Sequence, residues 1–179
     1  MDLPIRNVLR PGSLDEAVAM LAANPTAMAV AGGTDLAVQL RDGRRRTDLV
    51  VDLGRLDLAW IHEREGVVDI GAGTTMDVIA VSPVVRAAAP ALAAAAGQVG
   101  AWPIQCRATL GGNLANASPA ADCAPPLLVA DALLGLELLQ LVDLRLQRPG
   151  DLVEAHGQLG QVVLTAHEHP GLEVTGGEP

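Results

Sequence analysis

The chain lacks lysine, phenylalanine and tyrosine, and it has only two cysteines and two tryptophans among 179 residues. All twelve basic side chains are arginines, and 21 acidic ones give a formal net charge of −9. This balance excludes the basic stripe by which proteins bind nucleic-acid backbones, so we expect no nucleic-acid partner. Without Phe and Tyr, the core has to be built from Ala, Leu and Val, whose side chains each bury little area.

The two thiols, Cys106 and Cys123, form no CxxC pair and have no His at ligand spacing, which argues against zinc. We expect both to be buried small apolar residues, and Trp102 to fill core space. No signal peptide opens the chain, and the charge-free stretch 87–106 is interrupted by proline and glycine. We therefore expect a cytoplasmic protein with reduced thiols and no membrane span.

The first fifty residues predict a small α/β unit with parallel strands. Ser13 and Glu16 have capping-box spacing, which predicts a helix that ends before Pro25. An apolar strand, a Gly-Gly turn, a second helix capped by Thr34 and another apolar strand follow, at 27–31, 32–33, 35–41 and 49–53. The arginine run 44–46 is expected to be a solvated loop.

The pattern changes after residue 56. A β-hairpin is expected over 60–72, followed by short helices that open near Thr74, at Pro83 and at Pro90. Residues 100–108 are expected to be irregular, 122–130 helical and 133–141 extended. Beyond about residue 138 the periodicity weakens, which predicts a poorly packed tail.

Two Gly-Gly motifs, Gly32-Gly33 and Gly111-Gly112, are the sharpest chemical feature. Glycine has no Cβ, so consecutive N–H groups can approach an anion such as a diphosphate closely. Each pair could instead be only a tight turn. Because two such pairs occur in similar surroundings, the tight-turn and anion-binding interpretations have about equal weight. The dinucleotide fingerprint GxGxxG and the P-loop are both absent.

Polar side chains cluster after the second motif at Asn113, Asn116, Ser118 and Asp122. They could bind ribose or ribityl hydroxyls, or they could merely cap turns. Neither Ser118 nor Cys106 has a His nearby in sequence, so a nucleophile–base pair has no support.

The order and spacing of four segments resemble the FAD-binding medium subunit of molybdenum hydroxylases, the group of xanthine and carbon monoxide dehydrogenases. The segments are 31–36, 52–53, 70–75 and the long motif 109–122. The resemblance implies an α+β fold with two FAD-binding subdomains: a small βαβ-like unit at 1–55 and a mixed or antiparallel sheet with helices at 56–137. Residues 138–179 would be a divergent or truncated C-terminal segment.

The resemblance also implies the site. The diphosphate would be held by Ala31, Gly32, Gly33, Thr34, Asp35, Thr109, Leu110, Gly111, Gly112 and Asn113. Leu36, Ser118 and Asp122 complete the candidate cofactor-binding set, Asp122 near the ribose or ribityl hydroxyls. Ile104 and Gln105 would lie in the segment that approaches the flavin. Trp102-Pro103 and Cys106 depart from the family's usual residues.

By the same resemblance the chain is an oxidoreductase subunit that does not act alone. It would relay electrons from the iron–sulfur clusters of a small subunit to an acceptor, beside a large subunit with the molybdenum cofactor. The FAD would supply the redox chemistry, so no metal ligand or catalytic base is required of this chain. Two alternatives stay open: a non-catalytic remnant with weak or no FAD binding, and a stand-alone flavoenzyme of the related oxidase type.

Overall fold

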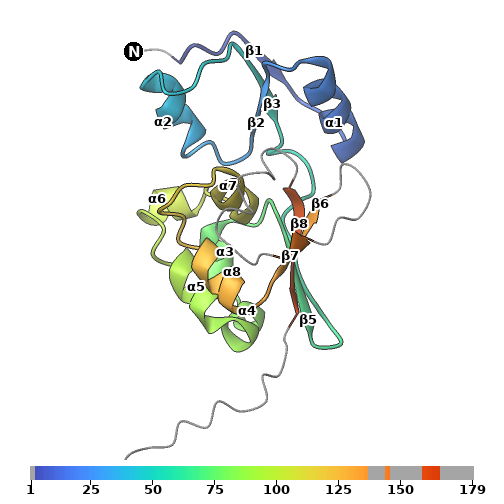
Figure 1. Ribbon diagram of the computed structural model, residues 1–179, viewed down its shortest axis with the longest axis vertical. Helices are drawn as coiled ribbons and strands as arrows, with labels where there is room; N and C mark the ends of the chain where they lie inside the picture. Colours follow the sequence, from blue (N-terminus) through green and yellow to red (C-terminus); the bar gives the residue numbers. More distant parts are fainter. Residues whose placement is uncertain (1–2, 137–143, 146–158, 166–179) are drawn as a thin grey trace, which may run out of the picture.

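The computed structural model describes residues 3–136, 144–145 and 159–165. They form two units, one above the other in Figure 1, each built on its own sheet. The first sheet has the strand order β1-β3-β2, and the second β4-β5-β8-β6-β7. This confirms the predicted α+β fold class. The predicted boundary near residue 55 stays a prediction, and it falls between β3 and β4.

The first unit is a parallel sheet with two helices. Its strands are β1 (Asn7–Leu9), β2 (Met28–Val30) and β3 (Leu49–Asp52), and its helices are α1 (Leu14–Ala23) and α2 (Leu36–Arg41). Central β3 pairs parallel with both neighbours, as predicted. Its Val50 and Val51 are buried because two strands flank them.

The capping box at α1 is confirmed with one change of partner. The Glu16 N–H donates to Ser13 Oγ at 3.2 Å, while the Glu16 carboxylate accepts from the Gly12 N–H rather than from Ser13. Thr34 was predicted to cap α2, but that helix begins after Asp35 and has no side-chain cap. The loop of Gly32 to Asp35 therefore enters α2 with its N–H groups unused by a cap.

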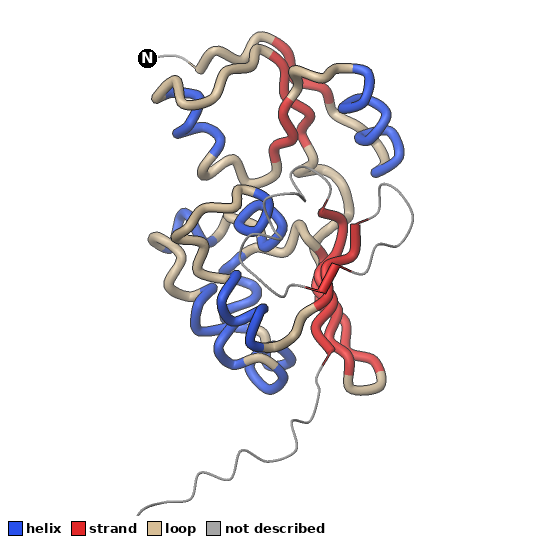
Figure 2. Tube along the Cα trace, in the orientation of Figure 1, coloured by secondary structure: helices blue, strands red, loops and turns tan. Residues whose placement is uncertain are grey.

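The second unit is an antiparallel sheet with helices α3 to α8 gathered on one side of it (Figure 2). The predicted hairpin is confirmed as β4 (Ile61–Arg64) and β5 (Val67–Gly71). Glu65 and Gly66 both have positive φ, 53° and 79°, which a tight two-residue hairpin turn requires. The remaining strands are β6 (Leu133–Leu136), β7 (Leu144–Arg145) and β8 (Leu159–Thr165).

Strand β8 corrects the expectation of a loose tail after residue 138. It lies in the middle of the second sheet, where it pairs antiparallel with both β5 and β6. The rest of the predicted tail, residues 138–143, 146–158 and 166–179, lies outside the described residues.

The helices of the second unit are short. They are α3 (Met76–Val81), α4 (Pro83–Ala88), α5 (Pro90–Ala96), α6 (Trp102–Gln105), α7 (Leu110–Ala115) and α8 (Ala124–Val129). Pro83 and Pro90 open α4 and α5 as predicted. Residues 100–108 are not wholly irregular, because α6 lies within them. Together with β5 the helices enclose a core that includes Ile70, Met76 and Leu110.

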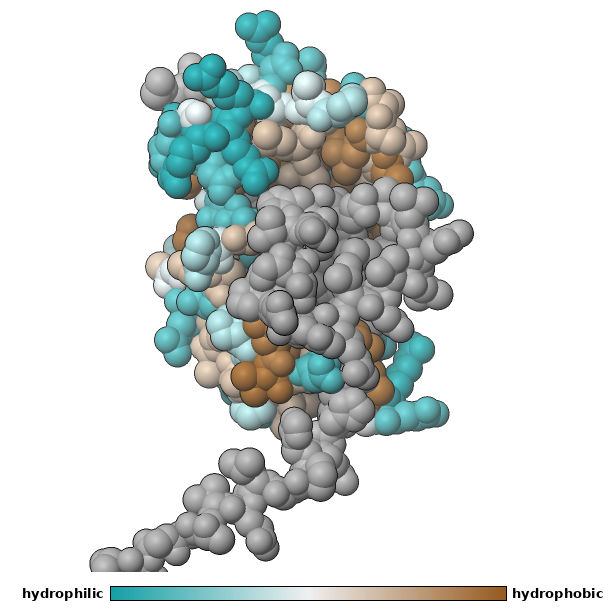
Figure 3. Space-filling view, in the orientation of Figure 1, coloured by the Kyte–Doolittle hydropathy of each residue, from teal (hydrophilic) through white to brown (hydrophobic). Residues whose placement is uncertain are grey.

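Two surface features complete the fold. The face around α2 is hydrophilic (Figure 3), and Arg44 and Arg46 are exposed as predicted, whereas Arg45 is half-buried. Trp102 was expected in the core but is 64% exposed, because α6 lies on the surface. Within the described residues, every helix is too short or too polar to cross a membrane.

Candidate functional site

Two adjoining cavities open between the two units. The larger has a volume of about 780 Å³ and the smaller about 320 Å³. They share one wall, formed by Ala29, Ala31, Gly32, Thr109, Gly112 and Ala115. Both glycine motifs contribute to this wall, so the structure brings together two segments that lie nearly 80 positions apart in the sequence.

The first motif is an open loop that leads from β2 into α2. Gly33 has φ of +73°, a conformation that favours glycine. Among the described residues, the backbone N–H groups of Gly32, Gly33, Thr34 and Asp35 have no hydrogen-bond acceptor. All four residues line the larger cavity. The loop therefore offers consecutive free donors, the arrangement that binds anions.

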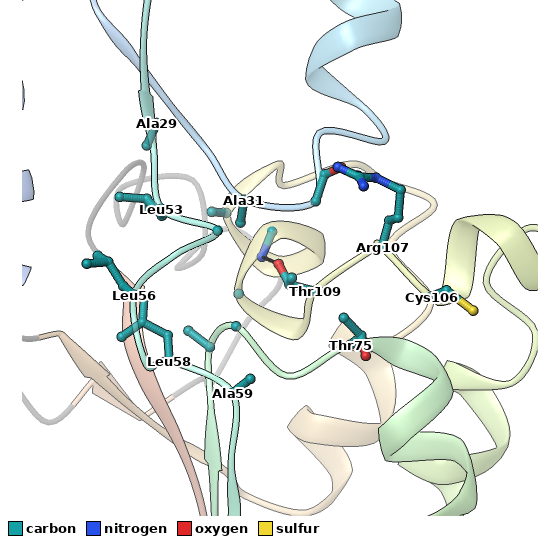
Figure 4. A pocket seen from close by; sticks show the side chains of 17 residues that line it. Ala29, Ala31, Leu53, Leu56, Leu58, Ala59, Thr75, Cys106, Arg107 and Thr109 are labelled. Carbon is teal, nitrogen blue, oxygen red and sulfur yellow. Dashed lines mark hydrogen bonds between the residues drawn. The ribbon is translucent and has the colours of Figure 1, made fainter. Parts of the chain in front are cut away.

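Gly32 is also a packing residue. A Cβ built on it would lie 1.8 Å from the carbonyl oxygen of Arg107, so only glycine allows the two backbones to meet. The Arg107 Nε donates to the Gly32 carbonyl at 3.1 Å. In Figure 4 the Arg107 side chain reaches from the wall that holds Thr109 toward the loop after Ala31. Gly32 can therefore both pack against the Arg107 backbone and let a ligand approach its own backbone.

The second motif begins a helix, whereas the sequence predicts a turn or an open loop there. Thr109 is the N-cap of α7, and Gly111 and Gly112 form its first turn. Its N–H groups already have acceptors: Leu110 donates to the Thr74 carbonyl, Gly111 to the Ala72 carbonyl, Gly112 to Thr109 Oγ1 and Asn113 to the Thr109 carbonyl. The second motif therefore lacks the free donors of the first.

The two glycines of the second motif differ. Gly111 is buried, and a Cβ there would lie 2.7 Å from the Cβ of Ala72. Gly112 is exposed and lines both cavities, and of the described atoms a Cβ there would meet only the Thr109 hydroxyl oxygen, at 2.8 Å. Gly111 therefore allows α7 to pack closely against Ala72. Gly112 has no side chain that would project from the shared wall into the cavities.

Of the other predicted site residues, some line a cavity and some do not. Ala31, Leu36 and Asn113 line the larger cavity. Leu110 is buried in the core, and Ser118 and Asp122 line neither cavity. Ser118 Oγ accepts from the Ala120 N–H, which is a turn-capping role.

The flavin-approach segment is also split. Ile104 lines the larger cavity. Gln105 lines neither cavity and donates through Nε2 to the Gly97 carbonyl at 2.9 Å.

Sequence reasoning missed three residues that shape this cleft. Gln39 Nε2 donates to Asn116 Oδ1 at 2.8 Å, which joins α2 to the end of α7. Arg45 lines the larger cavity and Arg107 the smaller. With Asp35, these arginines are the only charged side chains that line the cavities in the described part of the chain.

The thiols have different surroundings. Cys123 is buried as predicted, and burial, followed by the nearby Asp122 carboxylate, raises its pKa to about 12. Cys106 is exposed, contrary to expectation, and lines the smaller cavity. Partial desolvation, with the Asp77 carboxylate, raises the pKa of Cys106 as well. Both sulfurs are thus protonated near neutral pH, which disfavours thiolate nucleophiles.

Comparison with known proteins identifies the fold. The model for the FAD binding domain in molybdopterin dehydrogenase matches residues 4–155. The chain belongs to this family. The xanthine dehydrogenase FAD-binding subunit of Escherichia coli O157:H7 is 38% identical over 125 residues, which cover 69% of this chain and 43% of that protein. The nicotinate dehydrogenase FAD-subunit of Eubacterium barkeri is 38% identical over 109 residues, 60% of this chain and 37% of that protein.

Solved structures agree with this assignment. Carbon monoxide dehydrogenase from Hydrogenophaga pseudoflava matches with a TM-score of 0.80 and 25% identity, over 93% of this chain and 61% of that one. The predicted membership of the molybdenum hydroxylase FAD-binding family is confirmed, and with it FAD as the family's cofactor. The match spans less than half the length of the two FAD-binding subunits, 43% and 37% of their chains.

The cleft of this FAD-binding domain fits the cofactor's chemistry. The N–H donors of the Gly32–Asp35 loop, which no described residue accepts, suit an anionic diphosphate, and a Cβ at Gly112 would narrow the wall that the two cavities share. Both cavities border Gly112, and together they offer space for a dinucleotide with two bulky ends.

Proposed function

We propose that this chain binds FAD in the cleft between its two units and serves as the flavin subunit of a molybdenum hydroxylase. The observation that carries the proposal is the run of N–H donors at Gly32, Gly33, Thr34 and Asp35, which have no acceptor in the described part of the chain, in a member of the FAD-binding family. The diphosphate would accept hydrogen bonds from this loop, which needs no lysine.

The second motif would form the opposite wall. Its own N–H groups are engaged, so Gly112 would contribute space rather than donors, and the Asn113 side-chain amide could still donate through Nδ2, since its Oδ1 accepts from the Cys123 N–H. Ser118 and Asp122 line neither cavity, so contacts from them to ribose or ribityl hydroxyls would require the α7–α8 connection to move.

Bound FAD would supply one- and two-electron redox chemistry. The chain's own part would be to hold the cofactor and limit its exposure to water, since the apolar residues Leu53, Leu56 and Leu58 line the smaller cavity. We propose that the electrons come from an iron–sulfur small subunit, beside a large subunit with the molybdenum cofactor. Relatives named as FAD-binding subunits support this assembly. Two free cysteines favour the cytoplasm as its location.

Flavin retention tests the proposal directly. Gly33→Val should lose FAD, because its side chain would enter the larger cavity. Gly43→Val is the matched control: Gly43 has a similar φ, +71° against +73°, but no atom of the described residues lies within 4 Å of its Cβ, and it lines neither cavity. Strain from positive φ, about 1–2 kcal/mol, is then common to both.

The measurement is the FAD absorbance of purified protein together with its unfolding midpoint. Gly112→Val belongs in the same series, with flavin retention falling far more than stability. If Gly33→Val and Gly112→Val both retain flavin at the parent level, the site assignment is wrong. A parent chain without any FAD affinity would instead favour the non-catalytic remnant.

A second experiment tests the role as a subunit. The chain reconstituted with FAD should not oxidise xanthine, aldehydes or carbon monoxide with an artificial acceptor. Turnover should appear only when molybdenum and iron–sulfur subunits are added. Substrate-dependent turnover by the chain alone would favour the stand-alone flavoenzyme.

A further inference from the structure

Arg107 joins the two glycine motifs by two contacts. Its side-chain Nε donates to the Gly32 carbonyl at 3.1 Å, across 75 positions of sequence. Its own carbonyl oxygen lies against the Gly32 Cα, where a Cβ would fall 1.8 Å away. Gly32 is therefore held by the side chain and the main chain of one residue.

This contact fixes a peptide plane. The described chain contains no cis peptide bond, so the Gly32–Gly33 peptide is trans and planar. In such a unit the C=O and the N–H point in opposite directions. With the Gly32 carbonyl on Arg107, the Gly33 N–H points away from that side chain, and Gly33 lines the larger cavity. Arg107 thus sets the direction of one of the free donors.

The side chain is also suited to remain in place near an anion. Arginine stays charged at all accessible pH values, and its planar group has five N–H donors. Of the guanidinium N–H groups of Arg107, only the one on Nε has an acceptor among the described residues, and the side chain forms no salt bridge with them. A local cation also offsets the −9 net charge that would otherwise oppose a diphosphate.

We propose that Arg107 is a positioning residue for the diphosphate of the cofactor: by holding the Gly32 carbonyl it orients the Gly33 N–H toward the phosphate oxygens. The proposal rests on the FAD-binding function proposed above. It assigns a role to a residue outside the glycine motifs, and it predicts that Arg107 matters for the phosphate part of a flavin and not for the ring.

The test compares two probes on the full 179-residue chain. FAD carries the diphosphate, whereas riboflavin has the same ring and ribityl chain without phosphate. Both are titrated against wild type, Arg107→Met and Arg107→Lys, with flavin fluorescence as the readout. Arg86→Met is the matched control, because Arg86 Nε also donates to a backbone carbonyl, that of Ala80 at 2.8 Å, and Arg86 lines neither cavity.

Arg107→Met is expected to weaken FAD binding about tenfold, or about 1.4 kcal/mol, and to leave riboflavin binding within about twofold. Arg107→Lys keeps a charged donor and should bind FAD more tightly than Arg107→Met. Arg86→Met should match wild type for both probes. Thermal unfolding of each variant reports its fold.

Three results would overturn the positioning role. They are unchanged FAD affinity in Arg107→Met, an equal loss of FAD and riboflavin, which would indicate a merely structural residue, and the reverse order of the two Arg107 variants. Wild-type protein that binds neither probe overturns the proposed function itself, and the role of Arg107 with it.

Discussion

The Gly32–Gly33 loop and the Gly111–Gly112 helix start border the same cleft, yet they use their backbone N–H groups differently. In the first, the chain turns out of β2 and reaches α2 without a cap, so its N–H groups have no acceptor among the described residues. In the second, Thr109 and the carbonyls of Ala72 and Thr74 take up every N–H group from Leu110 to Asn113. A glycine pair therefore indicates an anion site only where its donors lack acceptors.

The largest effect is expected at Gly32, where the two motifs touch. Gly32→Ala would place a methyl group 1.8 Å from the Arg107 carbonyl, so the loop and the wall must separate. We expect a loss of about 3 kcal/mol or more in the free energy of unfolding, and loss of FAD binding. Urea unfolding measures the first and flavin titration the second.

Gly12→Ala is the control for that variant. Its methyl would meet only the Glu16 carboxylate, at 3.5 Å, and should change stability by less than about 1 kcal/mol. A Gly32→Ala protein as stable as Gly12→Ala would show that the described contact between the motifs is wrong.

The second motif should respond differently at its two glycines. Gly111→Ala adds a methyl 2.7 Å from the Ala72 Cβ in the core and should cost about 1–3 kcal/mol. Gly112→Ala meets only a hydroxyl that can rotate, and better helix propensity offsets the weakened cap, so stability should change by less than about 1 kcal/mol. Its FAD affinity should still fall. Equal destabilisation by the two variants would contradict the division of roles.

The packing behind the second motif can be tested through pH. The Cys123 N–H donates to Asn113 Oδ1, and the pKa of its thiol is raised to about 12 from 9.0. Between these values the folded chain holds a proton that the unfolded chain releases, so Cys123 contributes stability that is present below pH 9 and is lost toward pH 12.

We therefore expect the free energy of unfolding to fall by at most about 1.4 kcal/mol per pH unit above pH 9 from this group alone. Cys123→Ala removes that slope, so the stability difference between wild type and the variant should shrink as pH rises. A constant difference up to pH 11 would refute the buried, protonated thiol.

The smallest effect is expected at the hydrogen bond between Gln39 and Asn116. Each single alanine variant should lose about 0.5–1.5 kcal/mol. A double-mutant cycle on unfolding free energies should then give a coupling of at least about 0.5 kcal/mol. Purely additive losses would show that the Gln39 and Asn116 side chains are not energetically coupled.

Local signals predicted local structure well. The Ser13 capping box, the Glu65-Gly66 turn, and the prolines that open α4 and α5 each depend on residues a few positions apart. Residues 111–112 were misread because glycine disfavours helices, and the carbonyls that hold α7 in place come from residues 72 and 74.

The cleft was only partly predictable, because several of its contacts join residues that are far apart in the sequence. The glycine motifs could be found by their sequence, and their meeting by the family resemblance. Arg107 could not be recognised as the contact residue, because its partner lies 75 positions away, and Gln39 is 77 positions from Asn116. Strand β8 was missed since its partners β5 and β6 are also distant.

The central position of β8 has a consequence for how the chain is made. On the ribosome the first sheet is complete once residue 52 has emerged, whereas β5 waits for a partner that begins at residue 159. At roughly 5–20 residues per second, that wait is on the order of 5 to 20 s. During it, β5 and β6 each keep an unpaired edge, the kind of edge that recruits other chains. Synthesis stalled before residue 159 should therefore favour aggregation of the second unit while the first is already folded.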